Sequence, residues 1–457
     1  MGHDGRARIG DWPDCLSREE FLTTNDLVWS RQVEQLRSSS RRNALIGGVL
    51  GNAFEAYDTA IYGYLAVVMG KLFFSAADPA VQVLSSLALF GVTFFMRPLG
   101  ALLFGPVADR IGRTPVLILM VAMMAGATAA VGLLPTYQSV GIAATASLVV
   151  LRLIQGLAVG GEFGTATSLL AEFAGRGKRG FATSWYIFSS LSGFLLAAIV
   201  VTVLTKVAGS EWVAITGWRW IFLLAAPLGL IAVFIRLRVG ETPEFSSISS
   251  KGETSRAPLR EVLSHHKPLL LAIGIGTLHS VAFYMAYAYA TTYIQTVSQL
   301  GFSAAFASTV VASAIGLIIL PFAGSAADRW GRRTVLTTGA VWLLLAAYPA
   351  FILMSAGLVG AFIGQALLGI GVGLFLSTST VTMAELFPTR VRATGSSVGY
   401  NFAASLFGGT APFISALLVS VTGITTMPAL YLAVAAALAL VCVGLIRPES
   451  LYNPEGP

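Results

Sequence analysis

The residues in this chain whose types and spacing could do chemistry are a few charged side chains inside long apolar stretches. Glu55 and Asp58 lie near the middle of the first stretch, Arg97 lies in the second, and Arg152 and Glu162 lie in the fourth. A charge at the centre of a bilayer costs ~2.5–3.5 kcal/mol on insertion scales, and such residues usually mark a site or pathway for a substrate or ion. These five residues are therefore the first candidates for function.

The three carboxylates are candidates for moving protons. Glu55 and Asp58 are three residues apart, so they are predicted to share one helix face. Two carboxylates close together in a low dielectric cannot both ionise cheaply, so one of them is expected to take up a proton. We expect Glu55, Asp58 and Glu162 to couple transport to protons. The alternative is that each carboxylate pairs with a basic group and only holds helices or loops together.

The two arginines are candidates for binding a substrate. Arg97 and Arg152 keep their charge and offer a planar fork to a carboxylate, either on a substrate or on Glu55 and Asp58. Tyrosine rings on the first, seventh and eleventh stretches, Tyr400 among them, could line a cavity and attract a quaternary ammonium group. The predicted substrate-binding set is therefore Arg97, Arg152, Tyr57, Tyr62, Tyr284 and Tyr287. The alternatives are helix packing for Arg97 and ordinary membrane packing for each tyrosine, and His279 is expected to be packed or hydrogen-bonded.

The composition predicts the elements that must position these residues. The chain is 55% hydrophobic and 11% charged, whereas soluble domains carry roughly 25% charged residues. A membrane-spanning helix needs ~20 mostly apolar residues. Twelve stretches qualify, at about 43–70, 82–107, 115–134, 141–172, 180–206, 216–238, 268–296, 304–327, 334–355, 357–386, 393–421 and 427–446. The predicted fold is an all-α membrane protein with twelve transmembrane helices in two six-helix bundles.

The basic residues predict the orientation and the domain limits. If the N-terminus is cytoplasmic, 24 of the 29 Lys and Arg residues fall on the cytoplasmic side, as the positive-inside rule requires. The formal net charge of +7 is then loop charge facing anionic lipid, and no nucleic-acid partner is expected. The expected parts are a cytoplasmic tail at 1–42, bundles at 43–238 and 267–447, a cytoplasmic linker at 239–266 and a cytoplasmic tail at 448–457.

A repeat supports the two bundles. The residues from Gly105 to Thr114 read GPVADRIGRT, and a related string, GSAADRWGRR, begins at Gly324. Such a self-match indicates duplicated halves. An aspartate in this turn can bond the backbone N–H groups at the positive end of a neighbouring helix. The predicted gate residues are Gly105, Asp109, Arg110, Gly112, Arg113, Asp328, Arg329, Gly331, Arg332 and Arg333. The alternative is that the turns only anchor the loops.

Several classes of protein are excluded or disfavoured. We find no nucleophile–base set inside the membrane, and the two Cys and four His residues have no metal-ligand spacing. An enzyme and a metal site are therefore not expected. The chain has no Gly-x-x-x-x-Gly-Lys-Ser/Thr loop, which excludes an ATP-driven pump. No cofactor is expected, and the proton gradient is the expected source of energy.

These residues together resemble the major facilitator superfamily. The repeated Gly-x-x-x-Asp-Arg-x-Gly-Arg turn on twelve stretches carries the likeness. More narrowly, the chain is similar to the metabolite:proton symporters, which include proline/glycine-betaine and α-ketoglutarate permeases. The supporting strings are GNAFEAYD at 51–58, RPLG at 97–100, RLIQG at 152–156, GGE at 160–162, GWRW at 217–220, ETP at 241–243, LFPTR at 386–390 and GYN at 399–401. Ala56 and Thr59 depart from the family pattern, which usually has bulky aromatics there.

The resemblance implies symport of a small organic solute with protons by alternating access. We expect import of a small carboxylate-bearing metabolite, with organic mono- or dicarboxylates ahead of zwitterions, because two intramembrane arginines favour a carboxylate. The alternatives are an osmolyte symporter of the proline/betaine type and a non-transporting membrane sensor on the same fold. The expected partners are the solute, protons and the lipid bilayer, and the expected state is a monomer in the inner (plasma) membrane.

Overall fold

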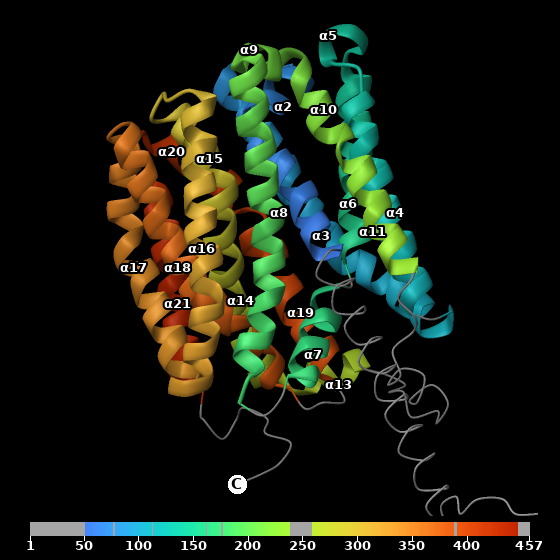
Figure 1. Cartoon of the computed structure of the whole chain (residues 1–457), viewed down its shortest axis with the longest axis vertical. Coiled ribbons are helices and arrows are strands. Elements are labelled where there is room, and N and C mark those ends of the chain that lie inside the picture. The colour runs from blue at the N-terminus through green and yellow to red at the C-terminus, as the bar shows by residue number, and fades with distance from the viewer. Residues whose placement is uncertain are drawn as a thin grey trace, which may run out of the picture.

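The computed structural model describes residues 51–75, 78–111, 113–160, 162–174, 177–237, 258–387 and 391–446, and within these ranges it contains helices and no strands. A chain this apolar becomes helical in lipid because a helix satisfies the backbone polar groups within its own segment. Figure 1 shows the helices standing roughly parallel to one another. The predicted all-α membrane fold is confirmed.

The described helices account for the twelve predicted segments. Ten helical segments are long and apolar enough to cross a membrane, and a shorter apolar helix spans Ile118–Leu133. The first segment is seen as helix 51–64 followed by α2 (Ala66–Phe73). The start of this segment, the tails at 1–42 and 448–457, and most of the linker lie outside the described residues.

The first half of the molecule, residues 51–237, contains the first six segments. After helix 51–64 and α2 come α3 (Pro79–Ile111), α4 (Arg113–Leu133), α5 (Tyr137–Val140), α6 (Ile142–Val159), α7 (Glu162–Phe173), α8 (Arg179–Ala208), α9 (Ser210–Trp212), η1 (Val213–Gly217), α10 (Trp218–Leu223) and α11 (Ala225–Leu237). Segment four was predicted as one helix but is two, α6 and α7. The break falls at Gly160, where glycine weakens a helix interior.

The second half, residues 258–446, contains the last six segments. It begins with the linker helix α13 (Pro258–Ser264), followed by α14 (His266–Tyr284), η2 (Met285–Tyr289), α15 (Ala290–Thr296), α16 (Phe302–Trp330), α17 (Arg332–Ser355), α18 (Leu358–Glu385), α19 (Arg392–Ala403), η4 (Ala404–Gly408), α20 (Ala411–Thr422) and α21 (Met427–Leu445). The elements η2 and η4 are single turns of π-helix inside segments seven and eleven.

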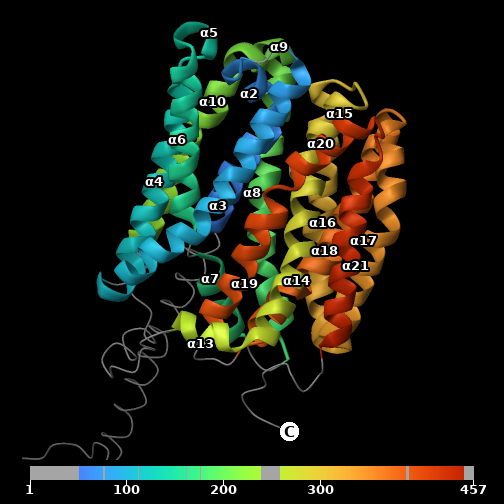
Figure 2. The same ribbon diagram turned by 180° about the vertical axis from the view of Figure 1, so that it is seen from behind.

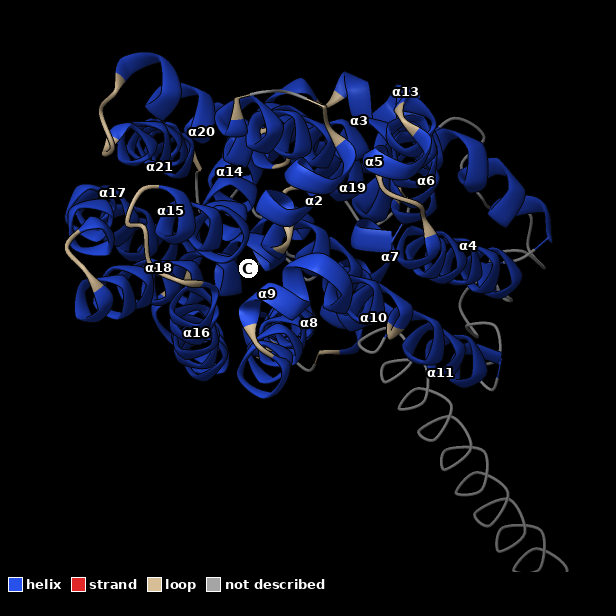
Figure 3. Cartoon of the chain, turned by 90° about the horizontal axis from the view of Figure 1, so that it is seen from above, coloured by secondary structure: helices blue, strands red, loops and turns tan. Residues whose placement is uncertain are grey.

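The two halves lie side by side. Figure 2 shows α4, α6 and α3 on one side and α16, α17, α18 and α21 on the other, and Figure 3 shows the same division from above. The end of the molecule that carries α7 and α13 is called the linker end here, and the end that carries α5 and α9 is called the far end. Large apolar side chains such as Leu230, Phe322 and Leu345 are exposed, as expected for helices that face lipid.

Glycines let the halves approach closely. A Cβ atom built on Gly180 of α8 would lie 2.7 Å from the carbonyl oxygen of Gly324 of α16, and the reverse distance is also 2.7 Å. Close backbone approach at small residues is the usual packing mode of membrane helices. On the other side of the molecule, the Ser405 hydroxyl donates to the carbonyl oxygen of Phe94 at 2.8 Å. The two halves therefore contact each other at α8 and α16 and, on the other side, at α3 and η4. The cavity described below lies between these two contacts.

Candidate functional site

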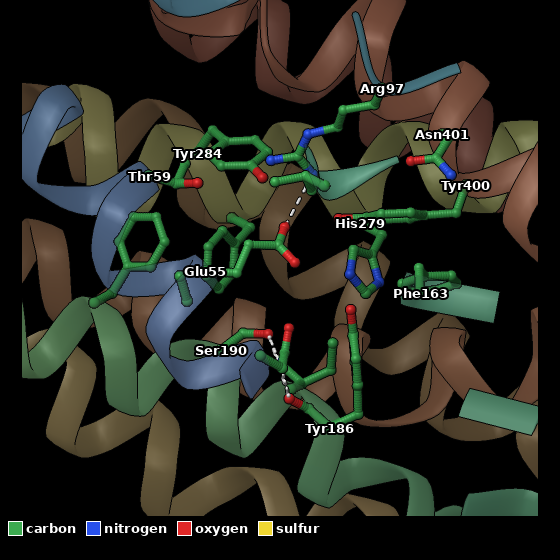
Figure 4. A pocket seen from close by; sticks show the side chains of 16 residues that line it. Glu55, Thr59, Arg97, Phe163, Tyr186, Ser190, His279, Tyr284, Tyr400 and Asn401 are labelled. Atoms are coloured by element: carbon green, nitrogen blue, oxygen red, sulfur yellow. Dashed lines mark hydrogen bonds and ion pairs between the residues drawn. The ribbon is translucent and has the colours of Figure 1, made fainter. Parts of the chain in front are cut away.

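A cavity lies between the two halves. Its volume is about 40 Å³, well below the ~300–1,000 Å³ of a typical small-molecule site, so the cavity is nearly closed in this structure. The first half contributes Asn52, Glu55, Ala56, Thr59, Arg97, Val159, Phe163, Tyr186, Ile187, Ser190 and Phe194, and the second half contributes His279, Phe283, Tyr284, Tyr400 and Asn401. Figure 4 shows Glu55 near the centre of this group, with its carboxylate facing the guanidinium of Arg97. A solute in the cavity would therefore contact both halves at once.

Glu55 and Arg97 form an ion pair in this cavity. Arg97 Nη1 lies 3.6 Å from Glu55 Oε1, and the two side chains are 5% and 11% exposed. This distance is longer than that of a charge-assisted hydrogen bond, which is about 2.7–2.9 Å. The two groups therefore attract each other electrostatically without forming such a bond. Arg97 also stacks on the ring of Phe94, with its Cζ atom 4.1 Å from the ring centroid, and its Nε atom has no hydrogen-bond partner within the described chain.

Asp58 belongs to a second polar cluster, buried among the helices of the first half. The side chains of Thr128 (α4) and Gln155 (α6) both donate to Asp58 Oδ1, the latter at 2.9 Å. Arg152 donates to Gln155 Oε1 at 2.8 Å and lies 3.9 Å above the ring of Tyr62. The cluster therefore joins the first, third and fourth segments around one carboxylate and one guanidinium.

The structure separates the two carboxylates that the sequence groups together. Both lie on helix 51–64 and are buried, but Glu55 lines the cavity while Asp58 points toward α4 and α6. A helix turns by about 300° over three residues, so neighbouring positions of one face can still contact different helices. The first half thus holds one acid and one base in the cavity and another acid and base behind the cavity wall.

Of the other predicted substrate-binding residues, one lines the cavity and the rest lie away from it. Tyr284 lines the cavity. Among the described residues Arg152, Tyr57, Tyr62 and Tyr287 do not line it. The Tyr57 hydroxyl donates to the carbonyl oxygen of Ile221 at 3.0 Å, and that of Tyr62 lies 3.4 Å from the carbonyl oxygen of Ser86. The Tyr287 ring packs beside Phe283, with 5.3 Å between centroids.

Glu162 is the first residue of α7, directly after the glycine break. Its neighbour Phe163 lines the cavity, whereas Glu162 is not among the described residues that do so. The structure therefore places Glu162 beside the cavity at the linker end rather than with Glu55 or Asp58. Its predicted part in proton coupling stays a prediction.

The second copy of the repeated turn forms a network between the halves. The Asp328 carboxylate accepts hydrogen bonds from the backbone N–H groups of Gly180 at 2.8 Å and Phe181 at 2.9 Å, at the start of α8. Arg332 donates to Asp328 at 2.7 Å and to Glu385 at 3.2 Å. Arg179 Nη1 lies 4.0 Å from Glu385. We call this set, which comprises Arg179, Gly180, Phe181, Asp328, Arg332 and Glu385, the linker-end network.

The remaining predicted gate residues are less informative. Arg329 and Arg333 are exposed, and Gly331 takes a positive φ of 87° between α16 and α17. In the first copy, Gly112 and the side chains of Asp109, Arg110 and Arg113 lie outside what the structure describes, as do the surroundings of Gly105. The proposed role of the first copy therefore stays a prediction.

Sequence reasoning missed several polar residues of the site. Tyr186, His279 and Asn401 line the cavity, and Gln155 and Thr128 surround Asp58. Asn52 donates to Ser189 at 2.6 Å and Ser190 at 2.7 Å and so ties helix 51–64 to α8. The available signal was a polar side chain in an apolar helix, which is weaker than a charge because many such residues bond their own backbone.

Comparisons with known proteins agree with this architecture. Residues 44–267 match the family model described as "Sugar (and other) transporter", and residues 307–457 match the model of the Major Facilitator Superfamily. An ectoine/proline transporter of Corynebacterium glutamicum is 38% identical over 96% of this chain and 89% of that protein. A proline/betaine transporter of Escherichia coli K12 is 34% identical over 93% of this chain and 87% of that protein.

A third relative and a solved structure extend the comparison. A glycine betaine/proline/ectoine/pipecolic acid transporter of Dickeya dadantii is 34% identical over 90% of this chain and 84% of that protein. The crystal structure of a D-xylose-proton symporter superposes with a TM-score of 0.72 at 17% identity, over 89% of this chain and 98% of that chain. The last likeness concerns the fold alone.

Proposed function

The chain belongs to the major facilitator superfamily, within the group of the proline/betaine transporters, and from this premise we propose that it imports a small zwitterionic osmolyte together with protons. It is a multi-pass membrane transporter and not an enzyme. The solute class that we propose is that of proline, betaine and ectoine, which the names of the relatives carry.

The observation that carries the proposal is the charge content of the cavity. Glu55 and Arg97 line it together, so it offers one anion and one cation. A zwitterion matches this pair, because its carboxylate can take the Arg97 fork while its ammonium group faces Glu55. A dicarboxylate would bring two negative charges to a site that already holds one, and like charges at close range are costly.

The proposed substrate class differs from the one that the sequence favours. From the sequence, organic carboxylates rank ahead of zwitterions because both Arg97 and Arg152 are counted as substrate ligands. Arg152 is instead engaged with Gln155 and Tyr62 beside Asp58, away from the cavity lining. One guanidinium therefore faces the solute, and the alternative of an osmolyte transporter becomes the better supported function.

Proton coupling is assigned to Asp58 and Glu55. Both carboxyls are buried in the first half, where leaving a charged carboxylate without partners costs far more than leaving a protonated one. Asp58 accepts two hydrogen bonds beside Arg152, so taking up a proton would change the bonding of the whole cluster. We further propose an inner-membrane location with both termini and the linker cytoplasmic, because the basic residues gather on that side.

Competition for uptake tests the substrate class. Proteoliposomes containing the purified protein would be loaded with labelled glycine betaine under an inward proton gradient, with proline, ectoine, succinate or xylose as unlabelled competitors. The proposal expects inhibition by proline and ectoine and none by succinate or xylose. Strong inhibition by succinate alone would contradict it and restore the carboxylate reading, and inhibition by xylose alone would contradict both.

A further inference from the structure

Four aromatic rings, those of Phe163, Tyr400, Tyr186 and His279, pack together at one end of the cavity, and we call them the box. Phe163 and Tyr400 are nearly parallel, with ring centroids 3.8 Å apart and an angle of 11°. Tyr186 stands at 89° to Phe163, with 5.3 Å between centroids. His279 stands at 89° to Phe163 and at 81° to Tyr400. Tyr186 and His279 thus stand perpendicular to a stacked pair whose faces are already in contact.

The box joins the two halves of the molecule. Phe163 and Tyr186 come from α7 and α8, whereas His279 and Tyr400 come from α14 and α19. Two hydrogen bonds cross between the halves beside the rings, because Gly164 N–H donates to Ser397 at 2.9 Å and Asn401 donates to the carbonyl oxygen of Gly160 at 3.4 Å. The parallel ring pair thus sits where α7 meets α19, between the cavity and the linker end.

The surroundings of the box suit a cation. All four rings line the same cavity as Glu55, and Figure 4 shows the Glu55 carboxylate facing Arg97, with the rings beside it. The faces of aromatic rings attract cations within about 6 Å of the ring centroid. His279 is held in place by Ser379, whose hydroxyl oxygen lies 2.7 Å from its Nδ1 atom. Arg97 pairs with Glu55 at 3.6 Å in the same cavity, where it can hold an anion.

The box is closed in this structure. Parallel rings 3.8 Å apart are in direct contact and leave no room between them. A methylated ammonium group could enter only if Phe163 and Tyr400 moved apart. Because the two rings belong to different halves, that movement would also separate α7 from α19 and strain the bonds beside them.

We propose that Phe163, Tyr400, Tyr186 and His279 form a cation subsite for the methylated ammonium group of the solute, and that the Phe163–Tyr400 pair is also the gate on the linker side. The subsite rests on the proposed function and extends it. Filling the box with a cation replaces the ring–ring contact by two cation–ring contacts, so solute binding favours the parting of the halves at the linker end. A solute without an ammonium group gains nothing from this step.

A methylation series tests the subsite. Glycine betaine, dimethylglycine and sarcosine share one carboxylate and one backbone and differ in the number of methyl groups on nitrogen. Their binding to the purified full-length protein would be measured by isothermal titration for the parent, Tyr400→Leu, Tyr400→Phe and Phe283→Leu. Phe283 lines the same cavity but is not a wall of the box, so its variant is the matched control.

We expect only one variant, Tyr400→Leu, to lose the preference for the more highly methylated solutes. Tyr400→Leu should weaken glycine betaine binding about tenfold while sarcosine changes much less, whereas Tyr400→Phe and Phe283→Leu should keep the parent's order. An unchanged order in Tyr400→Leu, or an equal loss in Phe283→Leu, would overturn the subsite and leave the proposed function standing. A parent that binds none of the three compounds would overturn both.

A crosslinking measurement keeps the test valid if Tyr400→Leu does not fold. In a variant with Gly164→Cys and Ser397→Cys, which lie beside the pair and leave both rings in place, a short thiol crosslinker should join the two positions readily. Saturating glycine betaine should lower the yield of crosslinked protein, because a cation between the rings parts α7 from α19. Crosslinking that glycine betaine leaves unchanged would contradict the proposed gate.

Discussion

The carboxylate of Asp328, near the end of α16, accepts a hydrogen bond from the backbone N–H of Gly180 at the start of α8, with 2.8 Å between the heavy atoms. The two residues are 148 positions apart in the chain and belong to different halves. A carboxylate at the start of a helix satisfies N–H groups that have no partner within the helix and faces the positive end of the helix dipole. Asp328 therefore caps a helix of one half with a side chain of the other.

This contact predicts how the linker-end network controls the conformation. Asp328→Ala should remove both bonds to α8 and shift the population toward the form that is open at the linker end, by about tenfold if the cap contributes ~1.4 kcal/mol. Distances between spin labels on α8 and α16 would report the shift. Arg333→Ala, an exposed neighbour, is the control. Identical distance distributions in Asp328→Ala and the parent would show that the turn only anchors its loop.

The cluster around Asp58 predicts a separation of coupling from binding. Asp58→Asn removes the titratable group but keeps the size of the side chain, so we expect it to abolish accumulation of solute under a proton gradient while binding affinity changes less than about threefold. Thr128→Val, which removes one hydrogen bond to Asp58, should leave coupling in place with a lower rate. Full accumulation by Asp58→Asn would contradict the assignment.

Arg97 and Arg152 should respond differently to substitution. Arg97→Gln removes the cation of the cavity and should weaken solute binding by roughly 10- to 100-fold, as expected for a charged hydrogen-bond partner. Arg152→Gln leaves Asp58 without its nearby cation and should lower thermal stability by about 3 kcal/mol or more, with little direct effect on affinity. Thermal unfolding of the detergent-solubilised protein and titration of glycine betaine would separate the two effects.

A double substitution sharpens the prediction for Arg152. Removing both charges with Asp58→Asn and Arg152→Gln should recover most of the stability lost in Arg152→Gln, because a buried pair costs most when one partner stays behind. Coupling should remain absent in the double variant. If the double variant were less stable than either single variant, the two side chains would not be compensating each other.

The topology that we propose predicts which thiols are accessible. Ser75, which is exposed at the far end after α2, should react with a membrane-impermeant maleimide when it is changed to cysteine in intact cells. Ser250→Cys in the linker should react only after the cells are opened, because the linker is on the basic, cytoplasmic side. Reaction of Ser250→Cys in intact cells would invert the orientation.

The sequence predicts the fold well because the bilayer constrains it strongly. Apolar length alone marks the spans, and the repeat from Gly105 to Thr114 and again from Gly324 marks the halves. The break between α6 and α7 was missed, because glycine is frequent in membrane helices and Gly160 does not by itself distinguish a break from close packing.

The site is harder to predict for a geometric reason. Charge inside a span identified Glu55, Asp58, Arg97 and Arg152 as unusual, but not which carboxylate faces which arginine. That depends on how helix 51–64 is rotated relative to α3, α4 and α6, and on a packing that a single sequence does not reveal. The lining residue Tyr186 carries no charge, so its sequence position does not distinguish it from an ordinary membrane aromatic.

Current across the membrane tests the central claim most directly. A zwitterion carries no net charge, so its symport with a proton moves positive charge inward, whereas a dicarboxylate that enters with two protons moves none. Proteoliposomes on a solid-supported membrane would be exposed to glycine betaine and to succinate at the same pH. We predict a transient inward positive current with glycine betaine, none with succinate, and none for Asp58→Asn. Uptake of glycine betaine without current and without dependence on the proton gradient would contradict proton-coupled zwitterion transport.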